Sequence, residues 1–171
     1  KDLGNRFIAF AGQSEMNGIF RSRGIKAMED ENDPGVKALL IDAEADLMAG
    51  RVKGLGTVFA NNSRAHPNPR FRRKAQTDSS SIRRLYDLAG KYGVALSIQM
   101  HADEDSLLQL ARLIATNPNV ALLWTQCGSD TTFEEVRRVL EQHGNVYCEL
   151  SWRFPPVTPA RLASRNIFDK N

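Results

Sequence analysis

Three polar side chains, His101, Gln126 and Arg153, each end or follow an apolar segment of this sequence and have the chemistry of a reaction site. An imidazole can bind a metal ion or move protons near neutral pH. An amide can orient a water molecule, and a guanidinium can pair with a carboxylate. If the fold brings them together, these residue types indicate a site for a small polar substrate.

The segment 94–101, which ends on His101, has the alternation of a β-strand. Successive side chains of a strand point to opposite faces. Apolar residues occupy one face: Val94, Leu96, Ile98 and Met100. Small or polar residues occupy the other face: Ala95, Ser97, Gln99 and His101. We therefore expect His101 at an inward-facing position at the carboxyl end of a strand.

Strands that alternate with helices are predicted along the whole chain. The strands are predicted at residues 6–11, 54–59, 94–101, 120–126 and 146–151. Cap residues predict helix starts at Asp33 with Pro34, at Ser80 or Ser81, at Asp105 or Ser106, and at Thr132. The helices are predicted to end at Gly50, at Gly93, before Pro118 and at Gly144. Residues 12–32 and 60–79 are predicted as long polar loops, the first with some helical turn.

This alternation predicts an α/β fold with a parallel sheet. Two architectures fit: an open doubly wound sheet of five strands, or part of a (β/α)8 TIM-type barrel, which needs about 250 residues. The central strands of a doubly wound sheet are apolar on both faces. Because the face that carries Ser97, Gln99 and His101 is small and polar, we favour the barrel, incomplete in this chain, with about five βα units.

The composition is that of an ordinary globular domain, with 42% hydrophobic and 25% charged residues. A net charge of +3 is too small to indicate a nucleic-acid partner, and no apolar run has the length of a membrane span. Two cysteines, Cys127 and Cys148, do not make a disulfide framework, and we interpret Cys127 as a small core residue. We expect a cytoplasmic protein without a nucleic-acid or membrane partner.

Several polar residues also have structural interpretations. His66 lies in a Pro-rich loop and is interpreted as a surface residue, and His143 complements the dipole at the end of a helix. The basic run at 70–74 has the charge to meet a phosphate or a carboxylate, but we interpret it as a solvated loop. The three candidate site residues could likewise serve as hydrogen-bonding, packing or capping residues at the rim.

Several segments, in their order along the chain, resemble the amidohydrolase superfamily. Residues 94–101 (V-A-L-S-I-Q-M-H) resemble the fifth barrel strand, which ends on a metal-binding histidine. Residues 117–128 resemble the sixth-strand segment, and residues 145–151 resemble the seventh strand. Residues 6–11 and 54–58 would then be the third and fourth strands. The branch that the chain resembles contains metal-dependent amidohydrolases, lactonases and decarboxylases such as aminocarboxymuconate-semialdehyde decarboxylase.

The resemblance implies that residues 1–171 form a single domain, the central portion of such a barrel. The His-x-His of the family's first strand is absent from this sequence, and the Asp of its eighth strand would lie beyond Asn171. The resemblance also implies one divalent metal ion, zinc in the simplest case, with His101 as a ligand. Gln126 stands where the family's sixth strand usually has a histidine.

We therefore expect a metal-dependent hydrolase or decarboxylase that acts on a small carboxylate- or carbonyl-containing substrate. Gln126 would orient water or substrate, Arg153 would pair with a carboxylate, and the protein could form a homo-oligomer. Two alternatives stay open. One is a metal-free barrel that binds a ligand or a partner, which Gln126 favours, and the other is a five-stranded flavodoxin-like domain that binds a small ligand.

Overall fold

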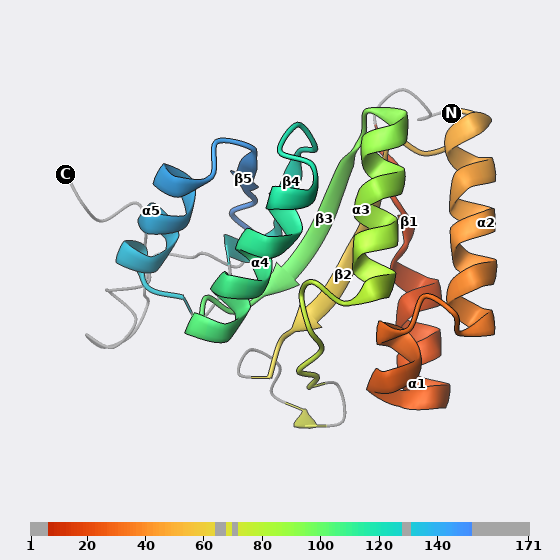
Figure 1. Cartoon of the computed structure of the whole chain (residues 1–171), viewed down its shortest axis with the longest axis horizontal. Helices are drawn as coiled ribbons and strands as arrows, with labels where there is room; N and C mark the ends of the chain where they lie inside the picture. Colours follow the sequence, from red (N-terminus) through yellow and green to blue (C-terminus); the bar gives the residue numbers. More distant parts are fainter. Residues whose placement is uncertain (1–6, 64–67, 70–71, 128–130, 152–171) are drawn as a thin grey trace.

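The computed structural model describes residues 7–63, 68–69, 72–127 and 131–151. One parallel sheet runs through them, with its strands paired in chain order: β1 (Ala11–Gly12), β2 (Gly54–Asn61), β3 (Ala95–Met100), β4 (Leu122–Trp124) and β5 (Val146–Cys148). The helices are α1 (Gln13–Glu29), α2 (Pro34–Met48), α3 (Ser80–Tyr92), α4 (Glu104–Thr116) and α5 (Phe133–Gln142), and the short 3-10 turn η3 (Thr125–Cys127) follows β4 (Figure 1).

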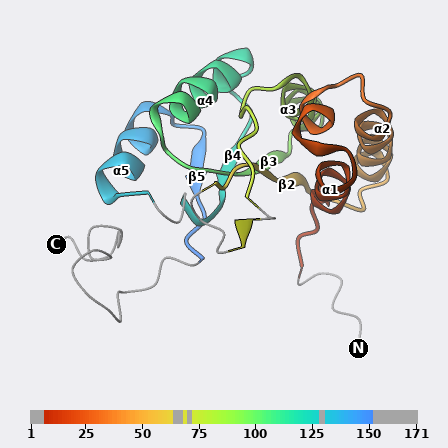
Figure 2. The same cartoon turned by 90° about the horizontal axis from the view of Figure 1, so that it is seen from below.

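The strand order decides between the two architectures. A doubly wound sheet reverses its order at a switch point and carries helices on both faces. Here the order is sequential, and α3, α4 and α5 follow one another along a single side of the sheet (Figures 1 and 2). The fold is therefore α/β and consistent with an incomplete TIM barrel, and its strand order disagrees with the flavodoxin-like alternative.

The two faces of the sheet differ as the alternation in residues 94–101 predicts. Leu96 and Ile98 are fully buried in the hydrophobic core that the sheet forms with the helices. On the opposite face, Ser97 is aligned with Leu123, and Leu123 with Tyr147. Tyr147 is 58% exposed, so this second face, which would be the lumen of a closed barrel, is uncovered at β5.

The predicted helix ends are largely confirmed. Asp33 caps α2, and its Oδ1 accepts the N–H of Gly35 at 2.8 Å. Thr132 and Glu135 form a reciprocal capping box at the start of α5. Gly93 ends α3 in the left-handed conformation, at φ 62°. The cap of α4 is Asp103, two residues earlier than the first of its predicted caps.

Two predictions near the start of the described chain are wrong. Residues 12–32 hold α1 rather than a long loop, although Gly24, at φ 82°, interrupts the helix. The helix forms because packing buries Met16, Ile19 and Met28, and its polar, glycine-containing sequence hides that spacing. The first strand covers only Ala11–Gly12, which pair with Leu55 and Gly56 of β2, and ahead of it the Ala9 carbonyl accepts one hydrogen bond from the N–H of Lys53 at 2.8 Å.

No helix in the described parts of the chain combines the length and the apolar character that crossing a membrane requires.

A barrel closed by further strands would bury Tyr147, and this gives a test of the fold. In the full-length protein we expect Tyr147→Asp to lower the free energy of unfolding by about 3 kcal/mol, because it places a charge in the lumen. Ile41→Asp, at an exposed position on the outer face of α2, is the matched control and should change it by less than about 1 kcal/mol. Urea unfolding of both variants measures this, and equal tolerance of the two would contradict a closed lumen.

Candidate functional site

Polar residues gather where the parallel strands end, at the edge of the sheet that Figure 2 views from below. Asn61 ends β2, His101 follows β3, Gln126 lies in η3 after β4, and Glu149 follows β5. In parallel α/β folds this is the edge at which sites are built. We call this group of residues the rim.

His101 is held at the end of β3 by backbone pairing with β2. Its N–H donates to the carbonyl of Asn61 at 3.0 Å, and the residue is only 2% exposed. The side chain of Asn61 fastens the next turn, since its Nδ2 donates to Asp103 Oδ2 at 2.9 Å and to Ser106 Oγ at 3.0 Å. The position of His101 is thus defined from both sides.

Gln126 is brought to the polar face of β3. Its Oε1 accepts a hydrogen bond of 2.5 Å from Gln99 Nε2, and Gln99 lies two residues before His101 in the chain. The backbone of Gln126 is left-handed, with φ 57°, which is uncommon for a residue other than glycine. This turn directs the side chain back toward β3, so that Gln99 in β3 and Gln126 after β4 are joined by a hydrogen bond.

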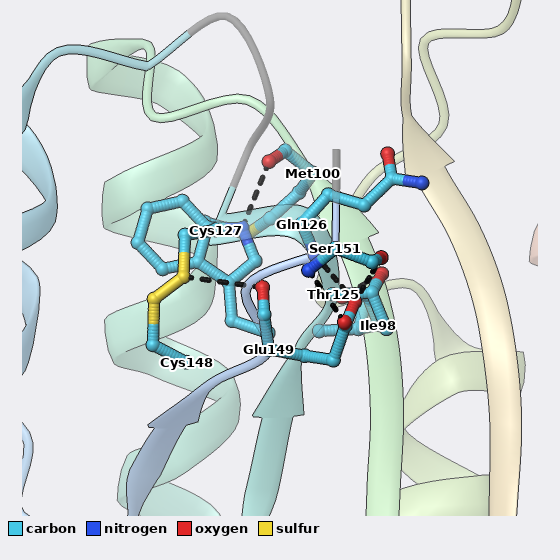
Figure 3. Close-up of a disulfide and its surroundings, with 9 residues drawn as sticks. Ile98, Met100, Thr125, Gln126, Cys127, Cys148, Glu149 and Ser151 are labelled. Atoms are coloured by element: carbon cyan, nitrogen blue, oxygen red, sulfur yellow. Dashed lines mark hydrogen bonds between the residues drawn. A yellow bond between two sulfur atoms is a disulfide. The ribbon is translucent and has the colours of Figure 1, made fainter. Parts of the chain in front are cut away.

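Glu149 is a rim residue that the sequence did not single out. Its carboxylate accepts the backbone N–H of Gln126 at 3.1 Å, and the N–H and hydroxyl of Ser151 at 2.6 and 2.8 Å (Figure 3). Burial acts to raise the pKa of this carboxyl, but these hydrogen bonds outweigh burial and hold the pKa below its usual value. The carboxylate therefore holds the left-handed turn in place.

A disulfide between Cys127 and Cys148 closes the same turn (Figure 3). Cys127 is fully buried in the hydrophobic core, as we interpreted it from the sequence, but it also forms a disulfide that the sequence analysis did not predict. Register explains the pairing, because Cys148 is aligned with Trp124 across β4 and β5, and the turn after Trp124 reverses toward β5. The two Cα atoms are 5.3 Å apart, although the two cysteines are 21 residues apart in the sequence.

The basic run at 70–74 is only partly the solvated loop that we expected. Arg72 and Lys74 are exposed, whereas Arg73 is 6% exposed and packs against the end of β2. The other predicted guanidinium, that of Arg153, lies outside the described residues, as does His66. Residues 72–74 are all basic in the sequence, so no alternation of apolar and charged residues separates Arg73 from its neighbours, and only the tertiary structure buries it.

The described residues do not by themselves compose a metal centre. A catalytic zinc ion usually has about three protein ligands, from imidazole, thiolate or carboxylate groups. Among the described residues, no three His, Cys, Asp or Glu side chains converge in a way that could hold one. His101 is the histidine at the rim, the carboxylate of Glu149 is engaged by Gln126 and Ser151, and Gln126 offers a neutral amide.

The turn at Gln126 should depend on the charge of Glu149. We expect Glu149→Gln to lower the free energy of unfolding by about 1–2 kcal/mol at pH 7, because it weakens hydrogen bonds to a carboxylate. Since the carboxyl pKa is lowered in the folded protein, its contribution is present above the unfolded pKa of about 4.3 and is lost as the pH falls through the folded value. The difference between wild type and variant should therefore shrink toward pH 3 in urea titrations.

Asp42→Asn, at an exposed position on α2, is the control for this measurement and should have little effect at either pH. A loss in Glu149→Gln that is no larger than the loss in the control, or that is independent of pH, would contradict the role of Glu149.

The amidohydrolase family matches residues 23–168 of this chain, a stretch that contains all the rim residues described above. No curated protein sequence and no solved structure gives a significant match to the chain. The family supports a hydrolase-type function on a small-molecule substrate, usually with a divalent metal. Because the match covers most of the sequence and agrees with the sequential parallel sheet, the chain belongs to the amidohydrolase family.

Proposed function

We propose that the chain is the central portion of a (β/α)8 enzyme, spanning residues 1–171, that hydrolyses or decarboxylates a small carbonyl- or carboxylate-containing substrate. The observation that carries this proposal is a buried polar group on the face of the sheet opposite α3, α4 and α5, in which Gln99, two residues before His101, bonds to Gln126. Polar residues with a purely structural role would be expected beneath the helices that cover the sheet. These polar residues instead lead to the carboxyl ends of the strands, where a substrate would enter.

In this proposal His101 is one ligand of a single divalent ion, with zinc as our choice. The other ligands would come from strands outside the described residues, because the described residues supply too few. Gln126 would not be a ligand. Its amide, held by Gln99, would orient substrate or water at the rim, while Arg153 would pair with a substrate carboxylate.

A second candidate function is a metal-free barrel that binds a ligand or a partner without turnover. The observation that favours it concerns Gln126, which stands where the family usually has a metal-binding histidine. Its amide is already hydrogen-bonded to Gln99. The two candidates share the fold and the rim and differ in metal content.

Metal analysis of the full-length protein separates them. We expect about one divalent ion per chain in the wild type and a loss of at least tenfold in occupancy in His101→Ala, because a first ligand is removed. Gln126→Ala should retain the ion, since it removes an orienting amide only. His143→Ala, at the C-terminal cap of α5, is the matched histidine control and should also retain it.

Equal metal content in wild type and His101→Ala would overturn the role of His101. A wild-type protein that binds no divalent ion after purification and reconstitution would favour the metal-free barrel.

We also place the protein in the cytoplasm, with a small molecule as its partner and a homo-oligomer as a compatible state. The cytosol keeps most thiols reduced, so this location requires Cys127 and Cys148 to be thiols in the cell and to form their disulfide after oxidation. Alkylation of acid-quenched cells should then label both cysteines without prior reduction. Labelling that appears only after reduction would contradict the cytoplasmic location.

A further inference from the structure

Arg73 is fixed next to the rim by the backbone. Its N–H donates to Asn62 Oδ1 at 2.8 Å, and its carbonyl accepts the N–H of Asn62 at 3.1 Å. The chain around it thus folds back along the end of β2, and the N–H of Ala75 continues the pairing to Ala60 at 2.9 Å. The direction of the side chain therefore follows from the sheet rather than from a free loop.

The guanidinium of Arg73 has aromatic neighbours and one neutral acceptor. It lies 4.0 Å from the ring centroid of Phe20 in α1 and 5.5 Å from that of Phe59 in β2. Its Nη1 donates to Asn17 Oδ1 at 2.8 Å. Its Nε is buried without a hydrogen-bond partner among the described residues. The edge formed by Nε and Nη2 is therefore not bonded to a described acceptor, and it is the edge that arginine presents side-on to a carboxylate.

Other buried charged groups of the described chain have an ion-pair partner, and Arg73 differs from them. The buried carboxylate of Asp33 pairs with Arg23 at 2.6 Å, and the buried carboxylate of Asp78 pairs with Arg83 and Arg112 at 3.1 and 2.6 Å. Within the described residues no carboxylate forms an ion pair with Arg73.

Burial and the nearby positive charge of Arg21 lower the pKa of Arg73 to about 10. The side chain is therefore still a cation at neutral pH, and a buried cation without a counter-charge lowers stability. An arginine that served only the fold would be expected to have a partner, as Arg83 does.

The position of Arg73 suggests what the partner is. In the pairing of β2 with β3, Phe59 is aligned with Gln99, and Gln99 bonds to Gln126. Arg73 therefore lies across Phe59 from the polar group to which we assign the reaction. The planar, two-pronged edge and the ring faces of Phe20 and Phe59 suit a planar anion with an apolar body.

We propose that the Nε–Nη2 edge of Arg73 binds the carboxylate of the substrate, with Asn17 orienting the guanidinium and Phe20 and Phe59 forming the wall of the subsite. This inference rests on the proposed function, which it deepens by making a carboxylate part of the substrate and by assigning the described residue that binds it. Arg73 is thus a binding residue of this chain in addition to the predicted Arg153.

The first test measures the melting temperature. If Arg73 serves the fold, removing its charge should lower the melting temperature, and if it serves binding, removing the charge should leave the temperature unchanged or raise it. In the full-length protein, Arg73→Met keeps the stem and removes the buried charge, so we expect its melting temperature to stay unchanged or to rise. Arg72→Met, at the exposed neighbour, should leave it unchanged. A fall of several degrees in Arg73→Met alone would show that the fold needs the charge, and would overturn the proposal.

The second test is direct binding, followed by the NMR signal of the Arg73 Nε–H group, which Arg73→Lys removes and so assigns. Benzoate and acetate are the probes, and benzamide is the neutral isostere of benzoate. We expect the carboxylates to shift this signal downfield, benzamide to leave it in place, and Arg73→Met to weaken benzoate binding at least tenfold. No shift with either carboxylate, an equal shift with benzamide, or tighter binding of inorganic phosphate would overturn the proposal.

The same titration in His101→Ala keeps the two proposals distinguishable. If benzoate still shifts the Arg73 signal in a protein whose metal content does not depend on His101, the carboxylate subsite holds and the metal proposal fails. If the metal depends on His101 but neither carboxylate shifts the signal, the proposed function holds and the assignment of Arg73 fails.

Discussion

The structure depends on the pairing of five parallel strands in the order in which the chain makes them. Because each strand neighbours the next in sequence, α3, α4 and α5 cover the same face of the sheet (Figure 2). A parallel sheet is ordinarily covered on both faces. Because α3, α4 and α5 cover only one face here, the other face is available for the polar residues of the site. Ser97 and Gln99 are buried there without penalty, because Ser97 hydrogen-bonds to Thr57 on the neighbouring strand β2 and Gln99 hydrogen-bonds to Gln126 in η3.

The rim is built by constraint as well as by chemistry. Gln126 and Cys127 both have positive φ, which costs free energy for residues other than glycine and persists only where the surroundings impose it. Here the surroundings are the carboxylate of Glu149 and the disulfide to Cys148. Two further hydrogen bonds tie the turn to β3, from Trp124 to the carbonyl of Met100 and from Thr125 to that of Ile98 (Figure 3). The result is an amide directed at Gln99 instead of a continued strand.

The other side of the rim is organised around a positive charge. Arg73 is stabilised by two aromatic faces and a single amide oxygen, and its burial lacks the counter-charge that Asp33 and Asp78 find elsewhere in the described chain. Natural proteins accept such costs mainly where function requires them. A rim with an unsatisfied cation on one side and a paired amide group on the other is asymmetric, and in the function that we propose this asymmetry would orient a substrate that has an anionic end.

Local sequence determined the elements that have a local cause. The alternation in residues 94–101 predicted a two-faced strand, and the caps at Asp33 and Thr132 predicted where helices begin, because strand faces and capping hydrogen bonds involve residues a few positions apart. Tertiary structure alone decided the rest. It made a helix of α1 by burying Met16, it joined Cys127 to Cys148, and it buried Arg73 in a run of exposed charge. These outcomes depend on register and on contacts between distant segments, which no local pattern encodes.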